Sequence, residues 1–112
     1  MVEGAFSNVL NEKKCLCTDL GVTGVSDAER LMSAWQGLCI AREAPDLLLF
    51  LAHPQTVSLG LRDRSARVPK DLLVSPKKLE EEGIALTRYI RGGGITYHWP
   101  GQVVCYPVLA LH

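Results

Sequence analysis

The chain has 112 residues, enough for one domain with a modest core, and its 12 basic and 12 acidic residues give a formal net charge of zero. Because no basic cluster is present, the electrostatic footprint of a nucleic-acid-binding protein is missing. The longest apolar run, residues 47–52, is far shorter than the about 20 residues that cross a membrane, so we expect a soluble protein without a membrane partner.

The amino terminus and the cysteines bear on where the protein works. Residues 1–14 place a basic pair after the apolar residues and also carry two glutamates, the reverse of a secretory signal. We therefore interpret 1–14 as a flexible lead-in to a domain over residues 15–112. The four cysteines are too few and too irregularly spaced for a secreted disulfide framework, which favours a reducing cytoplasm.

The first predicted elements are a strand, a helix and a second strand. Residues 16–20 are expected to form a short strand that ends at Gly21. Ser26 followed by Glu29 has the spacing of a capping box, and apolar residues then recur at helical intervals, which predicts a helix from Ser26 to about Arg42. Residues 47–52 are continuously apolar, the pattern of a strand that is covered on both faces and central in its sheet.

Shorter elements follow. Residues 56–59 are predicted to form a strand that ends at Gly60, and the charged segment 62–70 is expected to be a mobile loop. Ser75 at the N-cap, with a proline in the first turn and Gly83 as terminator, predicts one short helix.

The last part of the chain is predicted to be β structure. Residues 84–90 and 95–99 flank three glycines and predict a hairpin-like unit. Residues 102–111 are apolar and β-branched, and Pro107 removes one donor from the ladder, which predicts an edge strand or a bulge. The order of elements predicts an α+β fold in which helices pack against a mostly antiparallel sheet.

The segment from Arg91 to Gln102 is the most informative part of the sequence. It contains three consecutive glycines, which let a backbone approach a ligand or adopt positive φ, and four side chains that form hydrogen bonds. A tight turn before an ordinary half-buried strand would explain an isolated glycine triplet equally well. The polar residues after the turn alternate poorly with apolar ones, and the sequence Trp-Pro-Gly-Gln follows at once. These features favour a binding surface.

With its flanks, this segment resembles the substrate-binding segment of the octanoyltransferases of lipoate biosynthesis, which move an octanoyl group from acyl carrier protein to a lysine of a lipoyl domain. The matching positions are Arg91, Gly92, Gly93, Thr96, Tyr97, His98, Pro100, Gly101 and Gln102. The resemblance runs from about Cys17 to residue 112 and corresponds to the amino-terminal half of the family's domain. It implies the sheet shared by biotin and lipoate protein ligases and no metal or nucleotide cofactor. The implied partners are octanoyl acyl carrier protein and the lipoyl domains of 2-oxoacid dehydrogenases and of the glycine cleavage system.

The resemblance also implies a substrate site without its catalytic groups. The predicted substrate-binding residues are Arg91, Gly92, Gly93, Gly94, Ile95, Thr96, Tyr97, His98, Gly101 and Gln102. They are expected to line a tunnel for the acyl chain, with the backbone N–H groups of the glycines facing the acyl oxygen and His98 hydrogen-bonded within the wall. The family's nucleophilic cysteine and its lysine belong to the second half, so this acyltransferase fragment is expected to be inactive by itself. Trp99 departs from the glycine usual in the family, and its indole is expected to reshape the pocket.

Three other features have simpler explanations. Cys105 follows the motif, but it lies in an apolar strand without a basic neighbour to activate its thiol, so we do not assign it as a nucleophile. Cys15 and Cys17 share one strand face without a second pair of ligands at metal-binding spacing, so packing is favoured over a metal site. His53-Pro54 matches the family's strand-ending pair, and a turn with a satisfied imidazole is the favoured explanation.

Two alternatives to a truncated octanoyltransferase remain. One is a non-catalytic acyl-binding subunit of a split transferase whose partner supplies the cysteine and the lysine, and an exposed apolar edge near residues 103–111 would support it. The other is a relative of the lipoate or biotin protein ligases, which use ATP. Such a ligase needs a nucleotide-binding lysine segment, and none is visible in this sequence.

Overall fold

The computed structural model describes residues 14–63 and 69–111. The predicted lead-in, apart from its last residue, and most of the loop predicted at 62–70 lie outside the described residues. The chain divides into two units: residues up to 52 together with those from 103 onward form the first unit, and residues 53–102 form the second. Among the described residues, no helix is long and apolar enough to cross a membrane.

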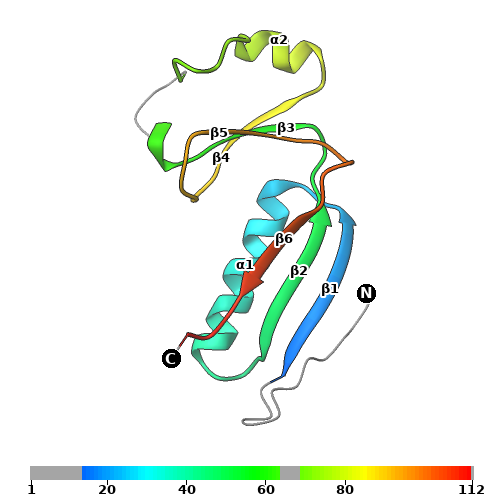
Figure 1. The fold of residues 1–112 in the computed structure, drawn as a ribbon, viewed down its shortest axis with the longest axis vertical. Helices are drawn as coiled ribbons and strands as arrows, with labels where there is room; N and C mark the ends of the chain where they lie inside the picture. Colours follow the sequence, from blue (N-terminus) through cyan, green and yellow to red (C-terminus); the bar gives the residue numbers. More distant parts are fainter. Residues whose placement is uncertain (1–13, 64–68, 112) are drawn as a thin grey trace. The chain divides into compact units, whose positions relative to one another are not determined.

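The first unit is a three-stranded sheet with one long helix (Figure 1). Its elements are β1 (Cys15–Val22), α1 (Val25–Ile40), β2 (Asp46–Ala52) and β6 (Val104–Val108). β2 lies in the middle, parallel to β1 and antiparallel to β6, which confirms the predicted central strand. The core consists of Ala28 of α1 and three leucines of β2, and partly buried side chains of β1, α1 and β6 pack around it. Pro107 lies on the edge strand β6, as predicted.

Helix α1 begins one residue earlier than the sequence pattern suggested. Gly24 is the N-cap, the Ala28 N–H donates to the Gly24 carbonyl at 3.0 Å, and no side chain caps the helix. The capping-box prediction at Ser26 was therefore wrong. The reason is the side chain of Val25, which is only 5% exposed and is buried at the first helical position.

The second unit also contains a three-stranded sheet. Its elements are β3 (Thr56–Leu59), the 3₁₀ turn η1 (Leu61–Asp63), α2 (Pro76–Glu81), β4 (Ala85–Arg88) and β5 (Ile95–His98). β3 is central, parallel to β4 and antiparallel to β5. Helix α2 starts as predicted, because the Ser75 hydroxyl accepts a hydrogen bond from the Lys78 N–H at 3.1 Å. Gly83 follows its end with a φ of 71°.

The predicted hairpin between β4 and β5 was wrong, because β3 lies between these two strands. Residues 89–94 carry the chain across the end of β3 and bond to the segment that follows it. The Gly60 N–H donates to the Gly94 carbonyl at 2.8 Å, and the Leu61 N–H donates to the Arg91 carbonyl at 2.9 Å. A Cβ at position 60 would overlap the Gly93 carbonyl, so this crossing requires glycine there.

The predicted α+β class is confirmed by these elements. Each of the two described sheets combines one parallel and one antiparallel pairing. A parallel pair requires a crossover connection, and both crossovers contain a helix, α1 in the first unit and α2 in the second.

Candidate functional site

One face of the second sheet is polar and buried. Strand alternation puts Thr56 opposite His98 and Ser58 opposite Thr96 on this face. Thr56, Ser58 and His98 are 3%, 0% and 8% exposed. Buried polar side chains need hydrogen-bond partners, so the arrangement of these partners defines the site.

His98 is held at both ring nitrogens. Its Nε2 lies 2.9 Å from the Ser58 Oγ, and its Nδ1 lies 2.9 Å from the Gln102 Oε1. With the amide oxygen of Gln102 facing Nδ1, that nitrogen carries the hydrogen, and Nε2 of a neutral ring accepts from the Ser58 hydroxyl. The ring of His53, which is 0% exposed, meets the His98 ring edge-on with centroids 5.1 Å apart. His98 is therefore fixed in position and in orientation.

Arg91 connects the glycine loop, residues 91–94, to the polar strand face. Its Nη2 donates to the carbonyl and the hydroxyl of Ser58, both at 2.8 Å, and to the Gly94 carbonyl at 2.9 Å. Its Nη1 donates to the Gly92 carbonyl at 2.9 Å. No carboxylate within the described ranges pairs with this guanidinium, and its Nε is buried without an acceptor there. Arg91 thus holds the loop against Ser58, and no carboxylate of the described residues neutralises its charge.

The carbonyl groups of all three glycines in the loop accept hydrogen bonds within the second unit. The carbonyls of Gly92 and Gly94 accept from Arg91, and the Gly93 carbonyl accepts from the Arg62 N–H at 3.1 Å. The N–H groups of these three glycines have no acceptor among residues 14–63 and 69–111. Because the C=O and N–H of a trans peptide point in opposite directions, the N–H groups of Gly93 and Gly94 face away from the groups that bind the Gly92 and Gly93 carbonyls, and they remain available to an external acceptor such as an oxyanion.

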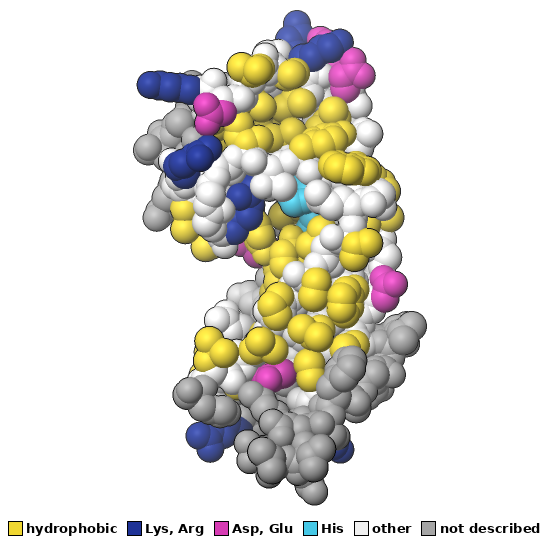
Figure 2. Space-filling model, viewed as in Figure 1, with side chains coloured by type: hydrophobic (Ala, Val, Ile, Leu, Met, Phe, Trp, Pro, Cys, Tyr) yellow, Lys and Arg dark blue, Asp and Glu magenta, His cyan; other side chains and the backbone are white. Residues whose placement is uncertain are grey.

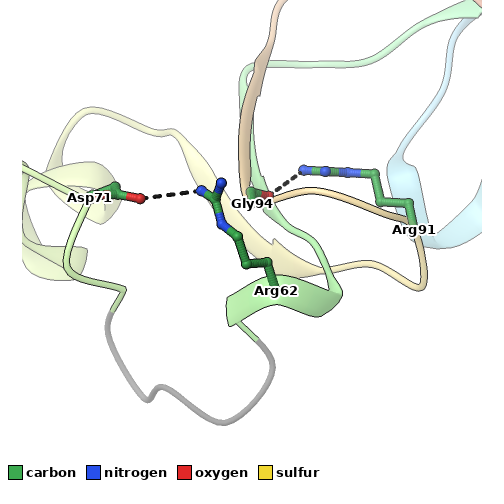
Figure 3. A network of polar contacts seen from close by, with 4 residues as sticks. All are labelled: Arg62, Asp71, Arg91 and Gly94. Atoms are coloured by element: carbon green, nitrogen blue, oxygen red, sulfur yellow. Dashed lines mark hydrogen bonds and ion pairs between the residues drawn. The ribbon is translucent and has the colours of Figure 1, made fainter.

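A second arginine lies against the same loop. The guanidinium of Arg62 contacts the Cα side of Gly94 so closely that a Cβ there would overlap it, and it forms an exposed ion pair with Asp71 at 3.2 Å. Figure 3 shows Arg62 and Arg91 approaching Gly94 from η1 and from the segment after β4. Both guanidinium groups therefore lie against the loop, that of Arg91 at the Gly92 and Gly94 carbonyls and that of Arg62 at the Cα of Gly94.

An apolar hollow of about 260 Å³ adjoins the loop. It is lined by Leu59, Gly60, Leu61, Arg88, Tyr89 and Ile90. The apolar hollow and the glycine loop meet at Gly60. This residue has no side chain, and the Gly92 and Gly93 carbonyls lie directly over it. The site of the second unit thus has a polar end and an apolar end.

The predicted substrate-binding residues are divided between two faces of the sheet. The glycine loop, Thr96, His98 and Gln102 gather at the polar face, as described above. Ile95 packs with the apolar cluster around Leu59. Tyr97 lies opposite Val57 and stacks on Trp99, with ring centroids 5.6 Å apart. Gly101 lies under the Trp99 indole, where a Cβ would come within 2.9 Å of Nε1.

Two residues central to the geometry, Ser58 and Gly60, were not predicted. The alternation of polar and apolar residues along 56–59 indicates that Ser58 shares a face with Thr56. Its pairing with His98, 40 positions away, depends on strand order, which periodicity does not reveal. Within the described part of the chain, no group of three or more histidine, cysteine or acidic residues could hold a metal ion.

The sequence profile of the lipoyl protein ligase A/B catalytic domain matches residues 29–112, and the chain belongs to this family. The resemblance inferred from the Arg91–Gln102 segment is thereby confirmed.

Individual relatives are octanoyltransferases. The chain is 38% identical over 85 residues to the octanoyltransferase of Caldicellulosiruptor saccharolyticus, which covers 76% of this chain and 34% of the relative. It is 46% identical over 66 residues to that of Chloroflexus aurantiacus, covering 59% and 28%, and 34% identical over 99 residues to that of Syntrophobacter fumaroxidans, covering 88% and 42%. The chain therefore spans well under half the length of these relatives. Among solved structures, P. falciparum LipL1 in complex with lipoate is similar at a TM-score of 0.49 and 17% identity, covering 77% of this chain and 29% of that one.

Proposed function

We propose that this chain supplies the acyl-binding wall of an octanoyltransferase domain, which transfers an octanoyl group from acyl carrier protein to a lysine of a lipoyl domain. The observation that carries the proposal is the glycine loop, whose N–H groups have no acceptor among the described residues, together with the apolar hollow that reaches the loop at Gly60. A medium-length acyl thioester needs this combination, with donors for its carbonyl oxygen and apolar walls for its tail. The similarity to curated octanoyltransferases supports the same reading.

The apolar end would provide most of the affinity for substrate. Burying a seven-carbon tail is worth about 5 kcal/mol at about 0.8 kcal/mol per methylene. We assign the tail to the hollow beside Gly60 and the thioester carbonyl to the glycine N–H groups. The partners proposed from the family are octanoyl acyl carrier protein and the lipoyl domains of 2-oxoacid dehydrogenases and of the glycine cleavage system, in the cytoplasm.

His98 would act by positioning the wall. Both of its ring nitrogens are engaged within the second unit, by Ser58 and by Gln102, so neither is available to accept a proton from an incoming lysine. The nucleophilic cysteine and the activating lysine would come from the part of the domain that has no counterpart in this chain. Cys105 is exposed on β6 of the first unit and has no role in this scheme.

A chimeric enzyme tests the proposal. In the octanoyltransferase of C. saccharolyticus, this chain replaces the 85 residues that it matches. The chimera is incubated with octanoyl acyl carrier protein and an apo lipoyl domain, whose mass is then measured. We expect an octanoyl adduct on the lipoyl domain and none with the 112-residue chain alone. A folded chimera that transfers nothing would refute the proposal.

Matched glycine variants of the chimera test the backbone donors. Gly93 and Gly83 both have positive φ, 81° and 71°, so alanine strains the backbone at either position. Gly93→Ala is expected to reduce transfer by about 10- to 100-fold, because it redirects donors of the site. Gly83 follows the end of α2, so Gly83→Ala should change only the free energy of unfolding. Equal losses of transfer in both variants would argue against a role for the loop donors.

A change of acyl donor distinguishes transferase activity from ligase activity. Free octanoate with ATP and Mg²⁺ replaces octanoyl acyl carrier protein in the same chimera assay. An adduct that forms only with ATP would favour the lipoate or biotin ligase relationship. We expect the adduct only from the thioester donor.

A further inference from the structure

The turn that follows β5 carries a tryptophan whose indole lies against the backbone of that turn. The Gln102 N–H donates to the Trp99 carbonyl at 2.9 Å and closes the turn, residues 99–102. A Cβ at Gly101 would come within 2.9 Å of the indole Nε1 and 3.1 Å of its Cδ1, so the ring covers that glycine. The same ring stacks on Tyr97, with centroids 5.6 Å apart and 26° between the ring planes. The indole of Trp99 thus links a strand side chain to the backbone of the turn.

This turn also carries the amide that orients His98. The Gln102 Oε1 lies 2.9 Å from the His98 Nδ1, and Gln102 is the last residue of the turn, so the turn determines where the amide lies. His98 and the ring of His53 beside it are 8% and 0% exposed. Figure 2 shows histidine side chains (cyan) over only a small area of this face of the molecule. Water therefore does not readily replace a lost partner of the His98 ring.

The amide of Gln102 determines which ring nitrogen of neutral His98 carries the hydrogen. With the hydrogen on Nδ1, Nε2 accepts from the Ser58 hydroxyl. The Ser58 oxygen then accepts from the Arg91 Nη2 at 2.8 Å, and the same Nη2 donates to the Gly94 carbonyl of the glycine loop. In the other tautomer Nε2 would donate to the Ser58 oxygen, and the hydroxyl would lose its acceptor. The hydrogen bonds that hold the loop thus depend on the tautomer of His98.

We propose that Trp99 is a positioning residue, which fixes the turn 99–102 so that Gln102 holds His98 in the Nδ1–H tautomer. Its indole stacks on Tyr97, which alternates with His98 along β5 and therefore lies on the opposite face of the sheet. Trp99 acts through the turn and not by touching a ligand at the polar face. The inference rests on the proposed function only where acyl transfer is measured.

The first test determines the tautomer of His98. Nitrogen NMR of the 112-residue chain with isotope-labelled histidine distinguishes the tautomers, and the His98 signals are assigned from their absence in His98→Gln. We expect the Nδ1–H tautomer in the unsubstituted chain and a mixture of tautomers in Trp99→Gly. Trp99→Phe should restore the single tautomer, because a phenyl ring can still stack on Tyr97. Trp35→Phe, in the first unit, is the control and should leave His98 unchanged. An unchanged tautomer in folded Trp99→Gly would overturn the proposal.

A double-mutant cycle tests whether Trp99 acts through Gln102. Gln102→Leu removes the acceptor of Nδ1 and should itself give a mixture of His98 tautomers. In this background Trp99→Gly should have no further effect, because two residues that act along one path are not additive. Additive effects would overturn the proposal, since the indole would then reach His98 by another route. Gly101→Ala, whose Cβ displaces the indole, keeps the test decisive if Trp99→Gly does not fold.

The chimera with the C. saccharolyticus enzyme connects the turn to the reaction. Trp99→Gly and Gln102→Leu should each lower transfer at saturating octanoyl acyl carrier protein by about 10-fold, because a displaced wall misplaces the substrate. Trp99→Phe should transfer as the unsubstituted chimera does. If Trp99→Gly instead changes the acyl chain length that is transferred and leaves the His98 tautomer unchanged, the indole lines the pocket and the proposal is overturned. An inactive chimera would refute the proposed function, whereas the tautomer measurement would still decide the role of Trp99.

Discussion

A side chain at position 60 would collide with the backbone of the glycine loop. The Cβ of Gly60→Ala would overlap the Gly93 carbonyl and come within 2.9 Å of the Gly92 carbonyl. We expect this variant to destabilise the second unit by about 1–3 kcal/mol, because backbone atoms yield less readily than a flexible side chain. Urea unfolding followed by Trp99 fluorescence measures the change.

Gly37→Ala is the control for this experiment. Gly37 lies within α1, and a Cβ there has no neighbour within 4 Å. Alanine should therefore stabilise the helix by up to about 1 kcal/mol. If Gly60→Ala unfolds at the same urea concentration as the wild type, the loop does not close on β3 as described.

The hydroxyl of Ser58 joins Arg91 to His98, accepting from the first and donating to the second. Ser58→Ala leaves the Nε2 of a buried histidine without a partner, which should cost about 1–3 kcal/mol of unfolding free energy. Thermal and urea unfolding give the value. Ser33→Ala, at an exposed position on α1, should be neutral or slightly stabilising. A Ser58→Ala chain as stable as this control would contradict the hydrogen-bonded network.

At the scale of elements, the two serines predicted as helix caps provide a matched pair. Ser75 caps α2 with its hydroxyl, whereas Ser26 is an exposed residue inside α1. Ser75→Ala is expected to cost about 1 kcal/mol. Ser26→Ala should change stability by less than about 0.5 kcal/mol. Urea unfolding of both variants checks the assignment, and a larger loss for Ser26→Ala would mean that α1 does begin at a capping box.

Local chemistry made several elements predictable. The start of α2 at Ser75 and Pro76, the central position of β2 and the edge position of Pro107 each follow from properties of a few neighbouring residues. The arrangement of β4 and β5 around β3 does not. Three glycines between two short strands are compatible with a hairpin, and only the hydrogen bonds from Gly60 and its neighbour to the loop show that the chain crosses a third strand instead.

The candidate site was predictable to a similar extent as the fold. The motif identified the glycine loop and His98, because unusual residue types cluster there. It did not identify Ser58 or Gly60, whose importance arises from tertiary contacts with that loop. The predicted strand over residues 95–99 does place Tyr97 and His98 on opposite faces, because side chains alternate along a strand.

At the scale of the whole molecule, the apolar core is divided between the two units, and each unit contains one tryptophan. Trp35 packs against the core of the first unit and donates its indole N–H to the Pro45 carbonyl at 2.8 Å. Trp99 belongs to the second. Single-tryptophan variants, made with Trp99→Phe or Trp35→Phe, therefore report on one unit at a time.

Leu49→Ala should lower the stability that Trp35 reports by about 2–5 kcal/mol, since Leu49 is 0% exposed in the core of that unit. Leu73→Ala, at a position 93% exposed, should have almost no effect on either probe. Fluorescence-monitored urea unfolding gives both values. A small loss for Leu49→Ala would mean that the leucine cluster of β2 contributes little to the fold.

Pro107 also affects how the protein behaves at high concentration. β6 is an edge strand of the described sheet, and a proline in such a strand has its missing N–H on the outer side. A strand from a neighbouring molecule that aligned with β6 would meet a gap in the donor row at that position. Fibril growth needs an unbroken ladder, so Pro107 should slow amyloid-like polymerisation along this edge. A chain with so much apolar surface thereby has a barrier to self-templated aggregation that a single codon change would remove.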